Sequence, residues 1–285
     1  IRKVKAEDME LAAEDSEEPV ASVDSRTKEE VLIDDATESM ILAVAHCYHF
    51  RLQKEGRFTR CELRNRLKEH LRVSVLTNSK PSTWLEDVLE KKLQWFIDAM
   101  KPLPAGVADN AALKENVFMM LVCVLNKIAI MCVGKPGLSK TLATQLIKNA
   151  LNHSNKKEKY DLVGFRSLNV FPYQCSEHST AQDIEAVFKK AIAYEKQYGA
   201  RSRAVVLLDE VGLAENAKAM PLKVLHKLLE EPKVGFIGLS NWTLDPAKMN
   251  RAYLPRPEWE NREDLHHTAV ELVKAKDQGD ISVRA

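Results

Sequence analysis

The chain has 285 residues, which is long enough for one or two domains with substantial hydrophobic cores. Lys and Arg number 42 against 41 Asp and Glu, and the resulting net charge of +1 argues against a general polyanion binder. The apolar runs, such as the one at 128–133, are too short to cross a membrane, so no transmembrane segment is expected.

The cysteines and the start of the chain bear on its compartment. The five cysteines stand far apart, and an odd number without a C-x-x-C pair argues against both a disulfide framework and a zinc site. A reducing, cytoplasmic compartment is therefore expected. No basic and then apolar leader opens the chain, so no secretory signal is expected. A chain that begins with Ile1 is compatible with a fragment of a longer protein.

Acidic residues dominate the first part of the chain. Residues 1–38 contain 13 acids and 5 bases, no aromatic residue and no sustained periodicity. Such a composition favours an acidic disordered segment at 1–36, which acts as a solvated linker or, as the alternative, as an interaction tail.

Helical periodicity begins after this segment and predicts a helical region at 37–108. Apolar residues recur at three- and four-residue spacing over 41–52, and a charged helix is expected over 57–71. A third helix is expected to begin near Trp84 and to end before Pro102.

From residue 109 onward the pattern predicts alternating helices and strands. Helices are expected at 109–127, 141–151, 180–198 and 221–231, and apolar strands at 128–133, 169–175, 204–208 and 234–239. The helix at 109–127 is expected to bury one apolar face, and Pro172 disfavours a central position for the second strand. Strands that are apolar on both faces and separated by helices predict an α/β fold with a parallel sheet covered on both sides, placed at 109–258.

The strongest motif is a glycine-rich loop between the first strand and its helix. It consists of Gly134, Lys135, Pro136, Gly137, Leu138, Ser139, Lys140 and Thr141. Backbone N–H groups of such a loop can surround a polyphosphate, and the helix N-terminus adds partial positive charge. Lys140 would bridge the β- and γ-phosphates, and the Thr141 hydroxyl would hold Mg²⁺. Ser139 stands where glycine usually precedes the lysine, and a chance glycine-rich turn is the alternative.

Two acids end the third expected strand. Asp209 and Glu210 follow the apolar run at 205–208, 69 residues after Lys140. Asp209 could hold Mg²⁺ directly or through water, and Glu210 could orient and deprotonate an attacking water. An acid pair after an apolar strand also arises by chance, but its place one strand–helix unit after the loop favours ATP or GTP binding.

A polar strand end and a later arginine complete the candidate site. Asn241 ends the fourth expected strand and could position the water near the γ-phosphate; an ordinary turn asparagine is the alternative. Arg251 would end a short helix beyond that strand, from which it could reach a neighbouring subunit's phosphate as a finger. The alternative for Arg251 is a surface arginine without a role.

The order of these motifs resembles that of AAA+ ATPases. The sequence of the motifs resembles still more closely an AAA unit of the mysterin family. These proteins are giant AAA+ E3 ubiquitin ligases with a dynein-like motor core. The segments that carry this resemblance are 115–120, 134–141, 174–180, 208–215, 220–226 and 240–251. The resemblance is tight across about 109–252 and looser back to about Ala36. In that family too, serine commonly precedes the loop lysine.

The resemblance implies an ATP-binding and hydrolysing AAA+ core that works beside neighbouring AAA units and drives or gates a conformational change. It also implies partners in the ubiquitin system for a longer chain, although no zinc-ligand cluster places ligase chemistry here. A helical lid should follow the sheet, but only one helix is expected, at 262–276. Residues 259–285 are therefore interpreted as a partial lid or tail.

Three other functions are alternatives to ATP hydrolysis. The unit could hold ATP structurally with negligible turnover, although Lys140, Asp209 and Glu210 are all present. A stand-alone P-loop enzyme such as a small-molecule kinase would need an acceptor-binding lid and would leave Asn241 and Arg251 without a purpose. A nucleic-acid motor is disfavoured by the balanced charge and by the absence of a basic, aromatic-rich stripe.

Overall fold

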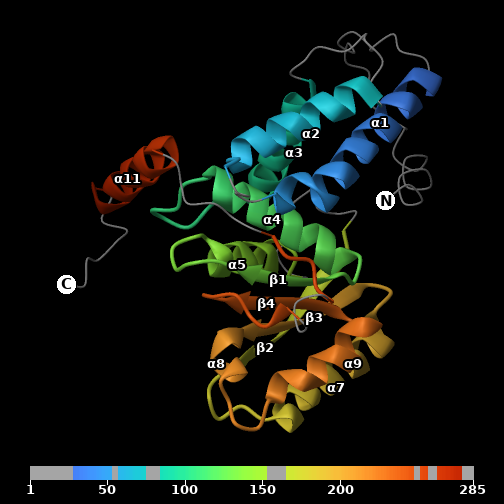
Figure 1. Ribbon diagram of the computed structural model, residues 1–285, viewed down its shortest axis with the longest axis vertical. Helices are drawn as coiled ribbons and strands as arrows, with labels where there is room; N and C mark the ends of the chain where they lie inside the picture. Colours follow the sequence, from blue (N-terminus) through green and yellow to red (C-terminus); the bar gives the residue numbers. More distant parts are fainter. Residues whose placement is uncertain are drawn as a thin grey trace, which may run out of the picture.

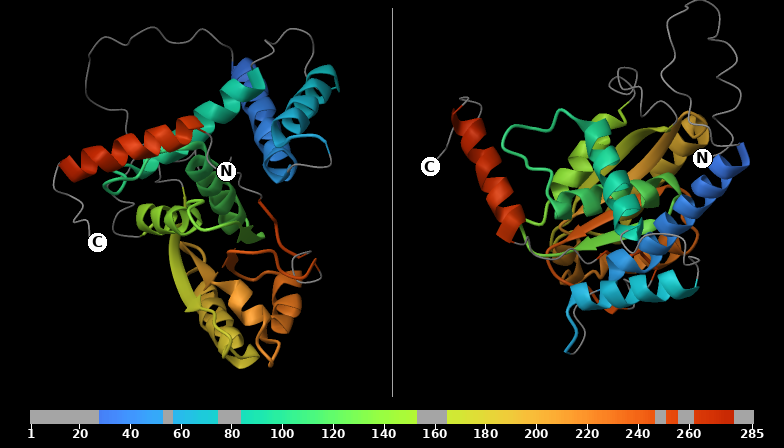
Figure 2. Two further views of the ribbon diagram at one scale, coloured as in Figure 1. Left: turned by 60° about the vertical axis from the view of Figure 1, so that its left-hand side comes forward. Right: turned by 90° about the horizontal axis from the view of Figure 1, so that it is seen from above.

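The protein is described by a computed structural model that covers residues 28–52, 57–74, 84–152, 165–246, 251–255 and 262–277. The helices α1, α2 and α3 lie on one side, above α4 and α5 in Figure 1, and the sheet lies beneath these two. The helices α7, α8 and α9 cover the other face of the sheet (Figure 1). The left view in Figure 2 shows the same layers after a turn of 60° about the vertical axis.

A four-stranded parallel sheet forms the centre of the α/β part. Its strands lie in the order β1 (Ala129–Val133), β4 (Gly235–Ser240), β3 (Ser202–Asp209) and β2 (Ser167–Gln174). Every neighbouring pair is parallel. The predicted α/β fold, a parallel sheet flanked by helices and preceded by a helical region, is confirmed.

The two faces of the sheet belong to two cores. Ile130, Val205 and Ile237 pack on the face that α4 and α5 (Lys140–Ala150) cover. Met131 and Val206 pack on the other face, whose helices are α7 (Ala181–Tyr198), α8 (Val211–Glu215) and α9 (Val224–Glu230), with η3 (Pro221–Lys223) before α9. Because successive side chains of a strand alternate between faces, a strand buried in both cores must be apolar throughout, as the sequence showed.

The two outer strands of the sheet differ in what lies beside their outer edges. β2 lies at one edge, and this position tolerates Pro172 because half of an edge strand's N–H groups have no partner strand. β1 lies at the other edge, and the backbone of Tyr253 lies beside it. The Met131 N–H donates to the Tyr253 carbonyl at 2.9 Å, and the Tyr253 N–H donates to the Ala129 carbonyl at 2.6 Å.

The helix α4 (Ala111–Leu125) lies between the sheet and the N-terminal helices. The expectation that it buries a single face is wrong, because eleven of its residues are buried. The helix α3 (Trp84–Met100) packs on α4 from the side opposite the sheet. A helix covered from both sides becomes apolar around most of its circumference, and only Lys114, Glu115 and Asn116 interrupt that character.

The N-terminal helices are α1 (Lys28–Cys47), η1 (His49–Arg51) and α2 (Arg60–Ser74), followed by α3. The start of α1 corrects the expected boundary at 36, since residues 28–36 are helical. Lys and Glu are strong helix formers, so a charged composition alone does not separate a solvated helix from a disordered segment. The rest of the expected acidic segment, 1–27, lies outside the described residues.

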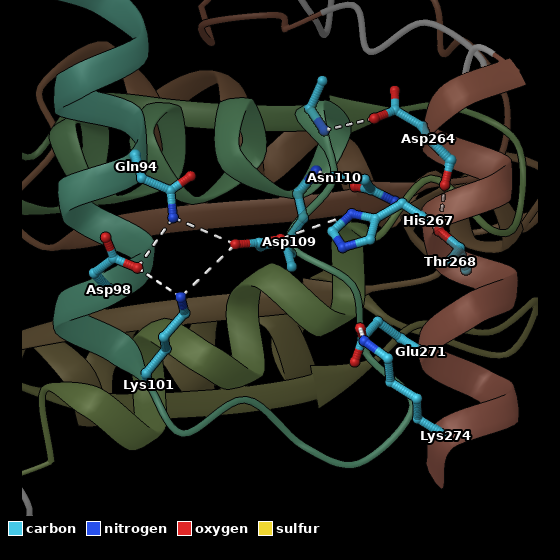
Figure 3. A network of polar contacts seen from close by, with 12 residues as sticks. Gln94, Asp98, Lys101, Asp109, Asn110, Asp264, His267, Thr268, Glu271 and Lys274 are labelled. Carbon is cyan, nitrogen blue, oxygen red and sulfur yellow. Dashed lines mark hydrogen bonds and ion pairs between the residues drawn. The ribbon is translucent and has the colours of Figure 1, made fainter. Parts of the chain in front are cut away.

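The helix α11 (Arg262–Asp277) lies beside the amino end of α4, and Figure 3 shows the polar contacts that hold it there. The Ala111 N–H donates to Asp264 Oδ1 at 3.2 Å, and Asn110 Nδ2 donates to Thr268 Oγ1 at 3.5 Å. The first N–H groups of a helix have no partner within it and favour a nearby acid. The one described helix of the expected partial lid is therefore docked on α4; residues 256–261 and 278–285 lie outside the described ranges.

No helix within the described ranges is long and apolar enough to cross a bilayer. The same ranges hold no group of three or more His, Cys, Asp and Glu side chains placed as metal ligands. All five cysteines are free thiols, with Cys47 and Cys61 exposed and the other three buried.

Candidate functional site

A pocket of about 510 Å³ opens at the carboxyl ends of β1, β3 and β4. It is lined by residues 136–142 of the glycine-rich loop and the start of α5, by Asp209 and Glu210, and by residues 239–241. Three segments that lie far apart in the sequence therefore meet in one place. Arg251 is not among the lining residues.

The strand order explains why these segments meet. β4 lies between β1 and β3, so Asn241, after β4, stands between the loop that follows β1 and the acids that follow β3. Lys140 Nζ lies 3.4 Å from Asn241 Oδ1, and Asn241 Nδ2 donates to both carboxylate oxygens of Glu210 at 3.0 Å. The amide thus presents its acceptor to the cation and its donor to the carboxylate, as its chemistry requires.

Two residues of the loop, on either side of Leu138, adopt left-handed backbone conformations. Gly137 has φ 90° and Ser139 has φ 53°. The second value explains why glycine usually precedes the lysine, since a residue with a Cβ pays about 1–2 kcal/mol in this region. Ser139 keeps the loop conformation at that cost. The helix α5 begins at Lys140, and its first N–H groups, which have no partner within the helix, lie where the pocket opens.

We expect Ser139→Gly to raise the free energy of unfolding by up to about 1 kcal/mol, because it removes the left-handed strain but enlarges the entropy of the unfolded chain. Ser139→Ala is the matched control, since alanine keeps the strained Cβ. Urea denaturation followed by circular dichroism measures both. A Ser139→Gly protein less stable than the parent would contradict this account of the loop.

Lys140 is buried, with 7% of its surface exposed. Its ammonium donates to the carbonyls of Gly134 and, at 2.8 Å, of Lys135. Burial lowers the pKa of Lys140, and the negative groups nearby, including Glu210 and Asp209, oppose this shift. The cation is therefore held at the loop by neutral oxygens, with the two acids at longer range.

The acid pair lies on a sharp turn from β3 into α8. Glu210 has φ 52°, an unusual conformation for a residue that carries a side chain. Asp209 Oδ1 accepts a hydrogen bond from the Glu210 N–H at 2.9 Å. The turn thus separates the roles of the two carboxylates: Asp209 bonds the turn itself, while Glu210 faces Asn241.

Arg251 lies outside this pocket. Its side chain is exposed, and one guanidinium nitrogen donates to His226 Nδ1 on α9 at 2.8 Å. The short helix expected before it falls on residues 247–250, which lie outside the described ranges. Of the sequence-predicted side chains, the structure therefore brings together Lys140, Thr141, Asp209, Glu210 and Asn241, and leaves Arg251 apart.

Two contacts around the pocket were not predicted from the sequence. Trp242 packs on Gly212 so closely that a Cβ there would lie 2.5 Å from Trp242 Cε2, which ties the turn after Glu210 to the end of β4. Asn116 Nδ2 donates to the Leu138 carbonyl of the loop at 2.8 Å. The only sequence signal for Asn116 was its polar side chain within an apolar helix.

Comparison with known proteins gives these residues a family context. Residues 106–263, more than half of the chain, match the RNF213 AAA domain family. The Homo sapiens E3 ubiquitin-protein ligase RNF213 is 40% identical over 227 residues, which cover 75% of this chain and 4% of that protein. The Danio rerio E3 ubiquitin-protein ligase rnf213-beta is 40% identical over 247 residues, which cover 81% and 5%. The chain thus spans only a small part of the length of these relatives.

Two solved structures resemble the chain over about two thirds of its length. Rhizobiales Trip13 has a TM-score of 0.32 and 21% sequence identity, with 68% of this chain and 60% of that chain covered. PCH-2 of C. elegans has a TM-score of 0.35 and 16% identity, with 66% and 53% covered.

Proposed function

This chain belongs to the RNF213 AAA domain family, and we propose that it binds and hydrolyses Mg²⁺-ATP as one unit of an AAA+ ring. The observation that carries the proposal is the single pocket that joins the glycine-rich loop, the acid pair and Asn241. In this role the unit drives or gates a conformational change in the longer protein that contains it.

The loop supplies the phosphate contacts. Its backbone N–H groups and the amino end of α5 favour a polyphosphate. The three oxygens that contact the Lys140 ammonium are neutral, and a phosphate would replace them with charged acceptors, which form the stronger hydrogen bonds. Thr141 and Asp209 would hold Mg²⁺, which neutralises charge on the β- and γ-phosphates. A site with so few protein ligands suits Mg²⁺, because this ion keeps several waters and takes phosphate oxygens.

Glu210 and Asn241 supply the groups for hydrolysis. Glu210 accepts the proton of the attacking water, and Asn241 orients that water beside the γ-phosphate. The 3.0 Å contacts of Asn241 with both Glu210 oxygens support a shared task, since one amide is within reach of the base and of Lys140.

We expect Lys140→Ala to weaken ATP binding at least roughly tenfold, because it removes a charge-assisted contact worth about 1.5–3 kcal/mol. Isothermal calorimetry measures the affinity. Lys148→Ala is the control, since it removes an exposed lysine charge from the far end of α5, outside the lining of the pocket. Equal ATP affinities of Lys140→Ala and the parent would refute the nucleotide assignment.

A second function, a nucleotide-holding module with negligible turnover, has one observation in its favour. Arg251 lies outside the pocket, and no other arginine of the described residues is among those that line it. A single-turnover ATP assay separates the two functions. The presence of Glu210 favours hydrolysis, because a module that only holds nucleotide needs no general base.

The proposed partners are neighbouring AAA units of the same or a longer chain. Proteins of the ubiquitin system are proposed partners only of that longer chain, because the relatives are E3 ubiquitin-protein ligases. Ubiquitin transfer is not located in this chain. No nucleic-acid partner is proposed, and the cytoplasm is the proposed compartment.

A further inference from the structure

Two adjacent polar side chains are buried within the mostly apolar helix α4. Asn116 has no exposed surface and Glu115 has 9% exposed. Burying an amide or a carboxylate costs free energy unless hydrogen bonds compensate for the lost water. The partners of these two side chains therefore indicate what they do.

Asn116 binds the phosphate loop at its centre. Its Nδ2 donates to the Leu138 carbonyl at 2.8 Å, and Leu138 lies between the two left-handed residues Gly137 and Ser139. Because a trans peptide is planar, its C=O and N–H point in opposite directions. Anchoring the Leu138 carbonyl on α4 therefore turns the Ser139 N–H away from α4, at a residue that lines the pocket.

The Asn116 side chain also carries an acceptor oxygen, Oδ1. Its Oδ1 is buried and has no hydrogen-bond partner among the described residues. An unpaired buried acceptor costs about 1–3 kcal/mol, so an apolar side chain of similar size would suit α4 better for stability alone. The contact with the loop is the feature that sets Asn116 apart.

Glu115 binds the N-terminal helical region. Its carboxylate takes two hydrogen bonds from Arg64, at 2.8 and 3.1 Å, and one from Arg60, at 3.0 Å, both on α2. Arg64 Nε also donates to the His49 carbonyl of η1 at 3.2 Å. Burial opposes ionisation of Glu115, but the two guanidinium groups outweigh it and hold the pKa of Glu115 below its usual value.

Adjacent residues of an α-helix point in directions about 100° apart. Within one turn of α4, Glu115 therefore points toward α2 and Asn116 points toward the loop. We propose that Asn116 is a positioning residue for the phosphate loop, and that the Glu115 ion pairs with α2 fix the orientation of α4 in which Asn116 reaches Leu138. This inference rests on the proposed nucleotide binding and concerns how the loop is held. It follows that a change in α2 alters nucleotide affinity at a site it does not touch.

The first test compares two variants of α4 in the full chain. Asn116→Leu keeps the volume but removes the donor, and Val124→Ala destabilises the other end of the same helix, where Val124 is fully buried. We expect the ATP Kd of Asn116→Leu to rise about fivefold, as for the loss of one hydrogen bond. Val124→Ala should lower the melting temperature and leave the Kd unchanged. A purely structural Asn116 would instead behave as Val124 does.

The second test acts from the helical region. Arg64→Met leaves Glu115 with Arg60 alone, whereas Arg66→Met removes an exposed arginine of α2 that stacks over Phe58 at 4.0 Å. We expect Arg64→Met to raise the ATP Kd about two- to fivefold, and Arg66→Met to leave it unchanged. The Arg64→Met/Asn116→Leu protein should bind ATP no more weakly than Asn116→Leu, because residues on one path are not additive.

The outcomes separate this inference from the proposed function. A parent chain that does not bind ATP, or a Lys140→Ala protein that binds it equally well, overturns the proposed function and the inference together. A parent that depends on Lys140, with parent-like affinity in Asn116→Leu and Arg64→Met, overturns the inference alone. If Asn116→Leu does not fold, the half-buried Arg64→Met decides: a Kd equal to that of Arg66→Met overturns the inference, and a raised Kd supports it.

Discussion

Glu210→Gln is expected to keep ATP binding and to lower the rate of hydrolysis by about 10²–10⁴, the usual contribution of a general base. The amide cannot take a proton from water. Asp209 and Thr141 remain to hold Mg²⁺, so the nucleotide still binds. The structure adds a second reason, because the amide replaces one of the two oxygens that now accept hydrogen bonds from Asn241 Nδ2.

This experiment needs both an affinity and a rate. Calorimetry gives the ATP affinity, and phosphate release gives the turnover of the unit within its ring. Glu185→Gln on α7 is the matched control, since Glu185 is a half-exposed carboxylate of a surface ion pair with Lys189. Hydrolysis by Glu210→Gln at the parent rate would assign the proton transfer to another residue.

The site was predictable where it depends on short sequence motifs and on one general property of parallel sheets. The loop, the acid pair and Asn241 each follow a strand, and the carboxyl ends of parallel strands share one edge of the sheet. The helix expected at 180–198 is α7, which Thr180 and Asp183 begin with a capping box. In each case the deciding residues are close in sequence or are brought together by the fold class itself.

The contacts that were missed join residues far apart in the chain. Asn116 meets Leu138 across 22 residues, and Arg64 meets Glu115 across 51. Neither pairing leaves a periodic signal, because it depends on how α4 is rotated and on what covers it. Because the sequence does not show what packs on α4, the pattern predicted a helix with one buried face, whereas the outer side of α4 lies under α3.

We expect this chain, purified as a verified monomer, to hydrolyse ATP slowly, and we expect Arg251→Ala to leave that slow rate unchanged. Arg251 lies outside the pocket and contacts His226 on α9, and we propose that it acts on a neighbour's nucleotide rather than on its own. An arginine finger contributes about 10³-fold or more to the rate of phosphoryl transfer. That loss should outweigh the small cost of the strained Ser139.

Adding the neighbouring AAA units should raise the turnover, and Arg251→Ala should then remove about 10³-fold of the rate at the neighbour's site. Arg201→Ala is the matched control, because Arg201 is an exposed arginine just before β3, at the amino ends of the strands and away from the pocket. Steady-state phosphate release with and without the neighbouring units measures the effect. Fast turnover of the monomer that disappears in Arg251→Ala would show that Arg251 acts on its own chain. The contact with His226 would then have to open for the guanidinium to reach the pocket that Lys140 and Glu210 line.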